Sequence, residues 1–188
     1  MTEPHADLPY RDRWCGELRP ADEGKEVRLA GWVHARRDHG GVYFFDLRDR
    51  SGLVQVVARP QDKEVFAAAE TLGSEAVISV VGRVSARPPG SENPKLPTGA
   101  VEVPARELRV LSVSKPPPFE VTDDSQAGEE VRLRHRYLDL RRPRMLRNLR
   151  RRHQAAQAVR RHLDALGFLE VETPILAKST PEGARDFL

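Results

Sequence analysis

The most chemically distinctive residues are arginines, which crowd into one stretch of the 188-residue sequence. Between Val131 and Leu163 the only acidic residue is Asp139. The arginines of this stretch are Arg132, Arg134, Arg136, Arg141, Arg142, Arg144, Arg147, Arg150, Arg151, Arg152, Arg160 and Arg161. A charge run of mixed sign is typical of a solvated helix face. Because this run has one sign, and because the arginine fork binds two phosphate oxygens at once, it favours nucleic acid as a partner.

Two further side chains are suited to unpaired bases. Phe44 lies in the middle of an expected strand, on the same side as Val42 and Asp46, and Gln55 lies on the next strand. An aromatic ring stacks on a base, and a glutamine amide offers an acceptor and donors to a base edge. The alternative is that Phe44 is an ordinary core residue, which composition alone favours because most strand aromatics are packed inside.

Composition describes a charge-rich globular protein, with 39% apolar and 31% charged residues. No apolar run approaches the roughly 20 residues that span a bilayer, and the acidic start lacks a signal peptide's apolar segment, so we expect a cytoplasmic protein. Cys15 is the single cysteine, which excludes an internal disulfide and a cysteine-cluster zinc site. The six histidines are scattered, so we expect no metal site built by this chain.

Alternation of apolar and polar residues predicts the strands that would position Phe44 and Gln55. These strands are expected at 27–37, 42–48, 53–58 and 76–84 and, after a proline-rich loop, at 101–103 and 108–113. After the third strand, helical spacing runs from Val65 to Leu72, and Gly73 would cap the helix. The predicted fold class is an all-β OB-fold barrel of five strands and one helix, whose sheet face and loops bind single-stranded nucleic acid.

A linker and a long helix are expected next. Three consecutive prolines, 116–118, favour an extended chain, and Pro143 suits the first turn of a helix. The helix would carry an apolar stripe made of Met145, Leu149, Ala156, Val159, Leu163 and Leu166. Gly167 would end the helix, and a short strand is expected at 168–171, before Pro174. The predicted domains are an OB-fold domain at 1–112, a linker or hinge at 113–143 and the start of a second domain at 144–188.

Several segments resemble one known family. WVHARRDHGGVYFFDLRDRSGLVQV, residues 32–56, resembles the anticodon-binding domain of bacterial aspartyl-tRNA synthetases, and YLDLRRP, residues 137–143, matches the same family. Motif 1 of the class II aminoacyl-tRNA synthetases resembles residues 167–176, through GF at 167–168, V at 171 and PIL at 174–176. The loop that follows motif 1 in aspartyl enzymes resembles STPEGARDFL, residues 179–188. Lysyl and asparaginyl relatives have different loops there. The resemblance indicates the N-terminal portion of a bacterial-type aspartyl-tRNA synthetase, with 144–188 as the truncated start of an α+β catalytic domain.

The resemblance implies which residues contact the anticodon. If the matching positions have the same roles as in the family, Phe44 stacks on an anticodon base, while Arg37 and Gln55 bind base edges. The remaining anticodon contacts fall to Arg87, Asn93 and Glu102. Two alternatives stay open, since Arg87 could clamp a phosphate and Glu102 could be an exposed strand charge.

Two positions bear on which transfer RNA is charged. The aspartate and asparagine anticodons share two bases, and family members that charge both transfer RNAs commonly carry a histidine in the first turn and a glycine in the proline-rich loop. His39 and Gly90 match this non-discriminating type. The alternative is ordinary turn chemistry, because Gly90 follows Pro89 and His39 precedes two glycines.

The resemblance also implies roles for the end of the chain. Motif 1, with Gly167, Phe168 and Pro174, forms the homodimer interface in the family. Glu182 matches a loop glutamate that binds the amino group of the substrate aspartate, a role that suits a carboxylate because ammonium is a three-donor cation.

The implied activity is that of an aspartate-tRNA ligase. With ATP and Mg²⁺ the full-length enzyme would form an aspartyl-adenylate and charge tRNA(Asp) and also tRNA(Asn). The arginines of motifs 2 and 3 and the metal-binding carboxylates would lie beyond Leu188. We therefore expect no catalytic residue and no bound cofactor within these 188 residues, and no activity from them alone. The alternatives are a stand-alone OB-fold RNA-binding module and a general single-strand binder.

Overall fold

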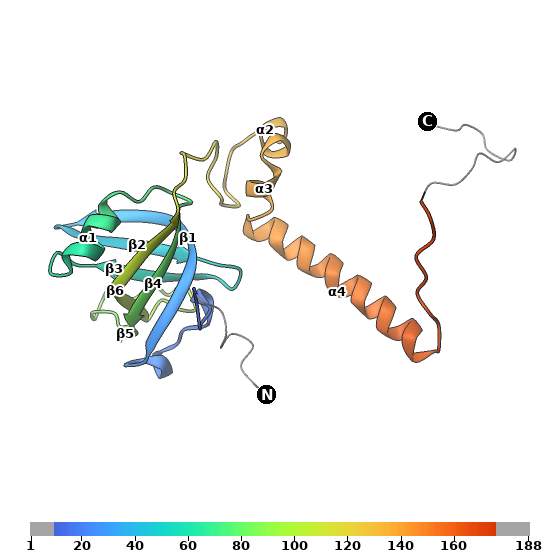
Figure 1. Cartoon of the computed structure of the whole chain (residues 1–188), viewed down its shortest axis with the longest axis horizontal. Coiled ribbons are helices and arrows are strands. Elements are labelled where there is room, and N and C mark those ends of the chain that lie inside the picture. The colour runs from blue at the N-terminus through green and yellow to red at the C-terminus, as the bar shows by residue number, and fades with distance from the viewer. Residues whose placement is uncertain (1–9, 176–188) are drawn as a thin grey trace, which may run out of the picture. The chain divides into compact units, whose positions relative to one another are not determined.

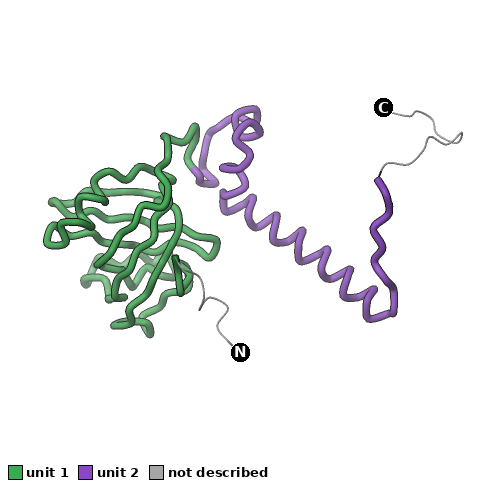
Figure 2. Tube along the Cα trace, in the orientation of Figure 1, with its two compact units in different colours: residues 1–120 green, residues 121–188 purple. Residues whose placement is uncertain are grey.

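The computed structural model describes residues 10–175 of the chain (Figure 1). The chain divides into two compact units, residues 1–120 and residues 121–188 (Figure 2). The division falls just after the three consecutive prolines, which favour extended chain.

A curled sheet dominates the first unit. Its strands are β1 (Glu26–His39), β2 (Val42–Arg48), β3 (Leu53–Ala58), β4 (Val77–Arg83), β5 (Ser85–Ala86) and β6 (Val101–Ser112). The strand order is β3-β2-β1-β4-β6-β5, and β6 also pairs with β3, in parallel, so the two sides of the sheet meet. With α1 (Lys63–Glu70) between β3 and β4, these elements have the order and closure of the predicted OB-fold.

The core fills the inside of this curled sheet. Phe45, Leu29, Leu47 and Ile78 are fully buried there, as the period-2 alternation of their strands requires. Helix α1 adds Val65, and the short 3₁₀-helices η1 (Cys15–Glu17) and η2 (Pro20–Asp22) precede β1. One continuous apolar cluster includes residues of all five long strands, so the first unit has a single core.

Three details of this unit differ from the sequence prediction. The segments expected at 101–103 and 108–113 are one strand, β6, and the two-residue strand β5 was not predicted. Pro104 does not break β6, because the register between β4 and β6 shifts at a bulge beside it, which is where a strand tolerates proline. Helix α1 ends at Glu70 with Thr71 as its right-handed C-cap, so the expectation that Gly73 caps the helix was wrong.

The second unit consists of helices and extended chain. They are α2 (Glu129–Arg134), α3 (Arg136–Asp139) and α4 (Pro143–Ala165). Pro143 begins α4 as predicted, and both carboxylate oxygens of Asp123 accept a hydrogen bond from the backbone N–H of Arg144, at 3.0 and 3.1 Å. This contact satisfies one of the free N–H groups of the first turn. The two short helices were missed because residues 129–139 lack an apolar periodicity.

The end of α4 follows the predicted cap. Gly167 has a φ of +83°, and the N–H groups of Gly167 and Phe168 donate to the carbonyls of Asp164 and Leu163, which is a glycine-based helix stop. The prediction of a strand at 168–171 was wrong, since residues 168–174 are extended without strand pairing. A strand requires a hydrogen-bonded neighbour, and the described part of the chain supplies none there.

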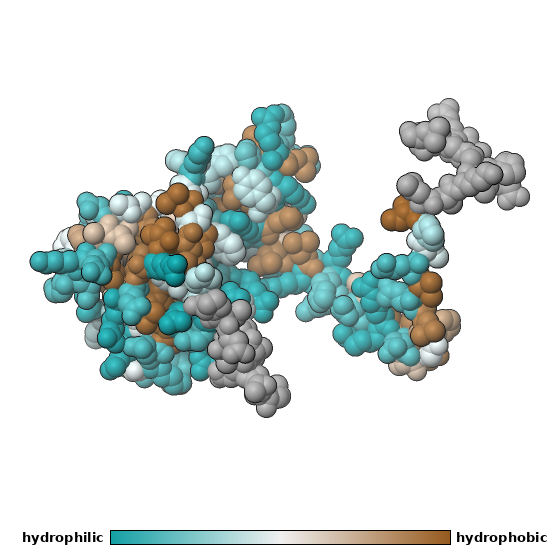
Figure 3. All heavy atoms as spheres, in the orientation of Figure 1, coloured by the Kyte–Doolittle hydropathy of each residue, from teal (hydrophilic) through white to brown (hydrophobic). Residues whose placement is uncertain are grey.

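The apolar stripe of α4 is largely uncovered. No residue of α4 is buried, and the side chains of Leu149, Val159, Leu163 and Leu166 are 41 to 62% exposed. Brown, apolar atoms are visible at the C-terminal end of this helix in Figure 3. Among the residues that the structure describes, no helix is long and apolar enough to cross a membrane.

Candidate nucleic-acid interface

Strand alternation decides the role of two neighbouring phenylalanines. On β2 the side chains of Tyr43, Phe45 and Leu47 are buried in the core, whereas Phe44 is half-buried on the opposite face. The alternative that Phe44 belongs to the core is therefore excluded, because Phe45 takes that place. A half-buried ring on an outer sheet face is available for stacking on a base.

A hollow of about 550 Å³ lies beside this ring. It is lined by Arg37, His39, Val42, Phe44, Gln55, Val57, Arg59, Arg87, Pro88, Ser91, Asn93 and Glu102. All six residues that the sequence assigned to the anticodon are in this set, and they come from β1, β2, β3, β6 and the loop that follows β5. We refer to it below as the base pocket.

The floor of the base pocket is polar and ordered. Gln55 and Glu102 are register partners in the parallel pairing of β3 with β6, and Gln55 Nε2 donates to Glu102 Oε2 at 2.9 Å. Their exposures are only 9% and 5%. Glu102 is thus not the exposed strand charge that the sequence left open.

Arg87 brings an unsatisfied donor to the same pocket. It is 8% exposed, and its Nε donates to the carbonyl of Val101 at 3.0 Å. Its Nη2 is buried and has no hydrogen-bond partner within the described residues. Burial lowers the pKa of the Arg87 guanidinium, while the nearby Glu102 carboxylate opposes this shift. A buried donor without a partner is costly, so this atom is suited to an acceptor on a ligand.

Two more arginines stand at the rim of the base pocket. Arg37 Nη2 lies 2.8 Å from Asp46 Oδ1, on the neighbouring strand. Arg59, which the sequence analysis did not single out, has its Nη2 3.8 Å from Glu102 Oε1. The signal that could have found Arg59 is its place directly after the strand that carries Gln55.

The proline-rich loop is folded tightly around one glycine. The backbone N–H of Asn93 donates to the carbonyl of Gly99, and Asn93 Oδ1 accepts from the N–H of Lys95. A Cβ on Gly99 would lie 1.8 Å from the carbonyl oxygen of Asn93, so only glycine allows this approach. The loop thereby places Asn93 at the base pocket.

His39 and Gly90, which the resemblance linked to tRNA discrimination, differ in their surroundings. His39 ends β1, is exposed and lines the base pocket. Gly90 lies in the same loop as Asn93 with a φ of +83°, and its N–H donates to Glu92 Oε2 at 2.8 Å. Gly90 does not line the pocket, and its left-handed backbone accounts for glycine there by itself.

Several arginines of the basic run bind acids within the second unit. Asp139 is fully buried and accepts hydrogen bonds from Arg136 at 2.5 Å and Arg142 at 3.1 Å. Asp123 contacts Arg147, and the Arg160 guanidinium binds Glu170 with three N–O distances between 2.8 and 3.1 Å. Part of the arginine run therefore stabilises the second unit. The shared positive charge of the run did not indicate this role.

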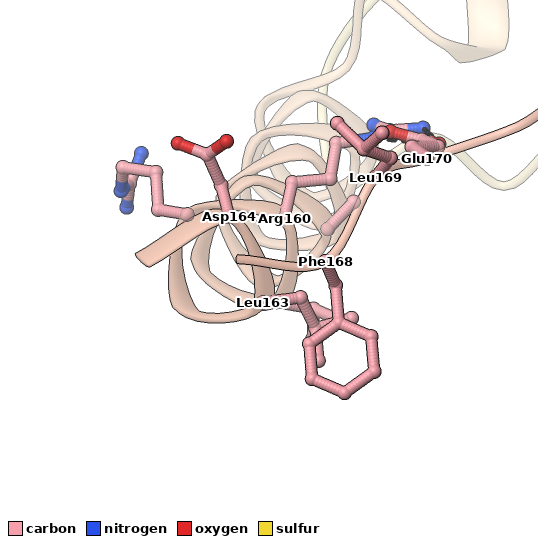
Figure 4. A pocket seen from close by; sticks show the side chains of 9 residues that line it. Arg160, Leu163, Asp164, Phe168, Leu169 and Glu170 are labelled. Carbon is pink, nitrogen blue, oxygen red and sulfur yellow. Dashed lines mark hydrogen bonds and ion pairs between the residues drawn. The ribbon is translucent and has the colours of Figure 1, made fainter. Parts of the chain in front are cut away.

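Of the motif 1 residues, Phe168 lines a second hollow, of about 700 Å³ (Figure 4). In the figure the Phe168 ring lies beside Leu163, and Arg160 meets Glu170. Phe168 is 62% exposed. Pro174 lies beyond the hollow, in extended chain, and Glu182 lies outside the described residues.

No group of three or more histidine, cysteine or acidic side chains in residues 10–175 is arranged to hold a metal ion.

Comparison with known proteins matches both units. Residues 27–111 match the family described as OB-fold nucleic acid binding domain, and residues 128–188 match tRNA synthetases class II (D, K and N). Aspartate–tRNA(Asp/Asn) ligase of Moorella thermoacetica is 58% identical over 179 residues, which are 95% of this chain and 30% of that protein. The enzyme of the same name from Rubrobacter xylanophilus is 56% identical, over 97% of this chain and 30% of its own length.

Solved structures agree with these matches. Asparaginyl-tRNA synthetase from Pyrococcus horikoshii is 34% identical with a TM-score of 0.74, over 88% of this chain and 38% of that one. Aspartyl-tRNA synthetase from Entamoeba histolytica has a TM-score of 0.77 at 22% identity, over 88% of this chain and 40% of its own, a likeness of fold alone.

The fold, the base pocket and these matches together define a class of protein, the class II aminoacyl-tRNA synthetases that carry an OB-fold nucleic-acid-binding domain. Within that class the chain belongs to the aspartyl-tRNA synthetase family. It spans about 30% of the length of the curated relatives it matches.

Proposed function

We propose that the base pocket reads the anticodon of tRNA(Asp). The observation that carries this proposal is the convergence of an aromatic face, an ordered amide and an unsatisfied arginine donor in one hollow of about 550 Å³. Stacking holds any base, whereas hydrogen bonds to base edges distinguish one base from another. The pocket offers both kinds of contact.

The residue roles follow from their chemistry. Phe44 stacks on one base, while Gln55 and Arg37 bind base edges. A carboxylate such as that of Glu102 accepts hydrogen bonds, whereas the Arg87 guanidinium can only donate. Asn93 adds a neutral amide from the loop. This division of donors and acceptors supports selection of a particular triplet over a simple affinity for single strands.

For the whole protein we propose ligation of aspartate to tRNA(Asp), and also to tRNA(Asn), through an aspartyl-adenylate formed from ATP with Mg²⁺. The names of the curated relatives, aspartate–tRNA(Asp/Asn) ligases, support both transfer RNAs. His39 at the base pocket and Gly90 in its loop are consistent with relaxed recognition of the third anticodon base. We propose that the whole protein acts in the cytoplasm.

A homodimer is part of the same proposal. The exposed apolar side chains of α4, together with the exposed Phe168 beside them, form a surface that the described chain leaves uncovered. Exposed apolar surface of this kind is typical of a subunit interface. We propose that Gly167, Phe168 and Pro174 contribute to it, and that Glu182 binds the amino group of aspartate in the complete active site.

Equilibrium binding to three anticodon stem-loops tests the anticodon proposal. The stem-loops carry GUC, GUU and a scrambled triplet, and each is measured at two salt concentrations. Equal, tight binding of GUC and GUU above the scramble is the expected result. Tight binding of GUC alone would leave anticodon reading in place and remove the dual specificity. Equal binding of all three, varying only with salt, would identify a nonspecific phosphate surface and favour a plain RNA-binding module.

A further inference from the structure

Arg59 occupies a place in the base pocket that the roles above do not use. It follows directly after β3, and its side chain is 50% exposed at the rim. Its Nη2 lies 3.8 Å from Glu102 Oε1, whose side chain is only 6% exposed. An ionised carboxylate at such depth needs compensation by charge or by hydrogen bonds. Arg59 is the rim cation that contacts it.

The two oxygens of Glu102 have different partners. Oε2 accepts from Gln55 Nε2 at 2.9 Å, and Oε1 faces Arg59. Because a carboxylate only accepts hydrogen bonds, the Gln55 amide must present its NH₂ group to Glu102. The side-chain carbonyl oxygen of Gln55 is therefore available to a ligand. Within the described residues it receives no hydrogen bond, and it is not among the fully buried polar atoms that lack a partner.

We infer that Arg59 is a positioning residue for base selection: it holds the Glu102 carboxylate, which in turn fixes the Gln55 amide with its carbonyl oxygen toward the base. This inference rests on the proposed anticodon reading. The pocket then selects, at the position next to Gln55, a base edge that offers an N–H donor. A base that offers only an acceptor there would face the oxygen and be rejected.

Single-base variants of the GUC stem-loop, changed at each triplet position in turn, test this role. Arg59→Gln removes the charge, whereas Arg59→Lys keeps it. We expect R59Q to lower the discrimination at one triplet position by roughly threefold to fivefold, the range of a half-exposed ion pair, and to leave the other two positions unchanged. R59K should retain most of the discrimination.

A second substitution separates positioning from direct contact. Glu102→Gln replaces the carboxylate with an amide that no longer dictates the Gln55 orientation, so R59Q should have no further effect on discrimination in the E102Q background. If R59Q instead weakens all stem-loops equally, reduces the salt slope by about one and does so equally in E102Q, Arg59 contacts phosphate and the inference is overturned.

The free chain provides a readout that needs no RNA. The side-chain amide resonances of Gln55 should shift in R59Q and return toward the wild-type values in R59K. Unchanged resonances in R59Q would contradict the inference alone, even if the wild-type chain discriminates triplets. A wild-type chain that binds every triplet alike would instead contradict the proposed anticodon reading, and the base selection assigned to Gln55 would fall with it.

Discussion

The base pocket depends on which of two adjacent phenylalanines faces outward. Phe44 is half-buried on the outer face of β2, and Phe45 is fully buried in the core. Leucine keeps the apolar character of either position but removes the aromatic face. Changing these two residues therefore separates base stacking from folding.

Phe44→Leu should weaken binding of the GUC stem-loop about tenfold, since stacking contributes roughly 1–3 kcal/mol per base, with little change in melting temperature. Its matched control, Phe45→Leu, should lower the melting temperature and leave affinity unchanged when binding is measured well below that temperature. Titration and thermal unfolding of both variants check this. Equal losses of affinity in the two variants would show that Phe44 supports the fold and does not stack.

A second residue-scale prediction concerns pH. His34 Nδ1 lies 2.9 Å from Arg48 Nη1, and Arg48 also binds the buried Glu75 at 2.7 Å. Burial and then the Arg48 charge lower the pKa of His34 below its ordinary value of 6.5, although Glu75 and Asp46 oppose this. The folded chain thus favours neutral His34, and the unfolded chain binds the proton more readily.

The stability that neutral His34 contributes is therefore present above pH 6.5 and is lost as pH falls below it. Thermal unfolding of wild type and His34→Asn, measured from about pH 7.5 to about 5.5, should give a shallower pH dependence for H34N. Asparagine keeps an acceptor near the Nδ1 position but does not titrate. Parallel curves for the two proteins would rule out His34 as the source of this dependence.

At the scale of elements, the loop between β5 and β6 leaves no room for a side chain at Gly99. Gly99→Ala would place a Cβ 1.8 Å from the Asn93 carbonyl oxygen, so the loop must shift. We expect a loss of about 1–3 kcal/mol in unfolding free energy and weaker binding of the GUC stem-loop.

Gly128→Ala is the matched control, because Gly128 has a φ of −61° and no atom within 4 Å of its would-be Cβ. Because Gly128 is the N-cap of α2, where glycine is preferred to alanine, this substitution should cost at most about 1 kcal/mol and less than G99A. Chemical denaturation of both variants provides the measurement. A G99A protein as stable as G128A would mean that the loop accommodates the methyl group and that glycine is not required at this position.

The elements also show what the sequence could and could not predict. β2 and β3 have the predicted limits, and β1 differs by one or two residues, because Gly40 and Gly41 punctuate strong alternation. The single course of β6 could not be predicted, since tolerance of Pro104 depends on a bulge formed with a distant strand. The ion pairs of Asp139 and the contact between Arg59 and Glu102 likewise depend on the folded chain.

For the whole molecule, the two units differ in how they bury apolar surface. The first has one continuous core, all of it within residues 15–110, whereas no residue of α4 in the second is buried. We therefore expect residues 1–120 to fold alone and to keep the triplet preference of the full chain. Without the arginines of α4, the salt dependence should be smaller.

Parallel titrations of residues 1–120 and of the full chain, with thermal unfolding of each, check this prediction. Cooperative unfolding of the shorter chain together with a lost triplet preference would mean that the second unit takes part in reading the bases. A non-cooperative transition would mean that the first unit needs the second in order to fold.

The location of the bound triplet is the most direct test of anticodon reading by the base pocket. A GUC stem-loop with 4-thiouridine at the middle base is crosslinked to the full chain by light, and the joined peptide is identified by mass spectrometry. We predict crosslinks to the strands that carry Phe44 and Gln55, reduced by an excess of unlabelled GUC stem-loop and not by the scrambled one. Crosslinks to the arginines of α4, reduced equally by both competitors, would contradict anticodon reading by the base pocket.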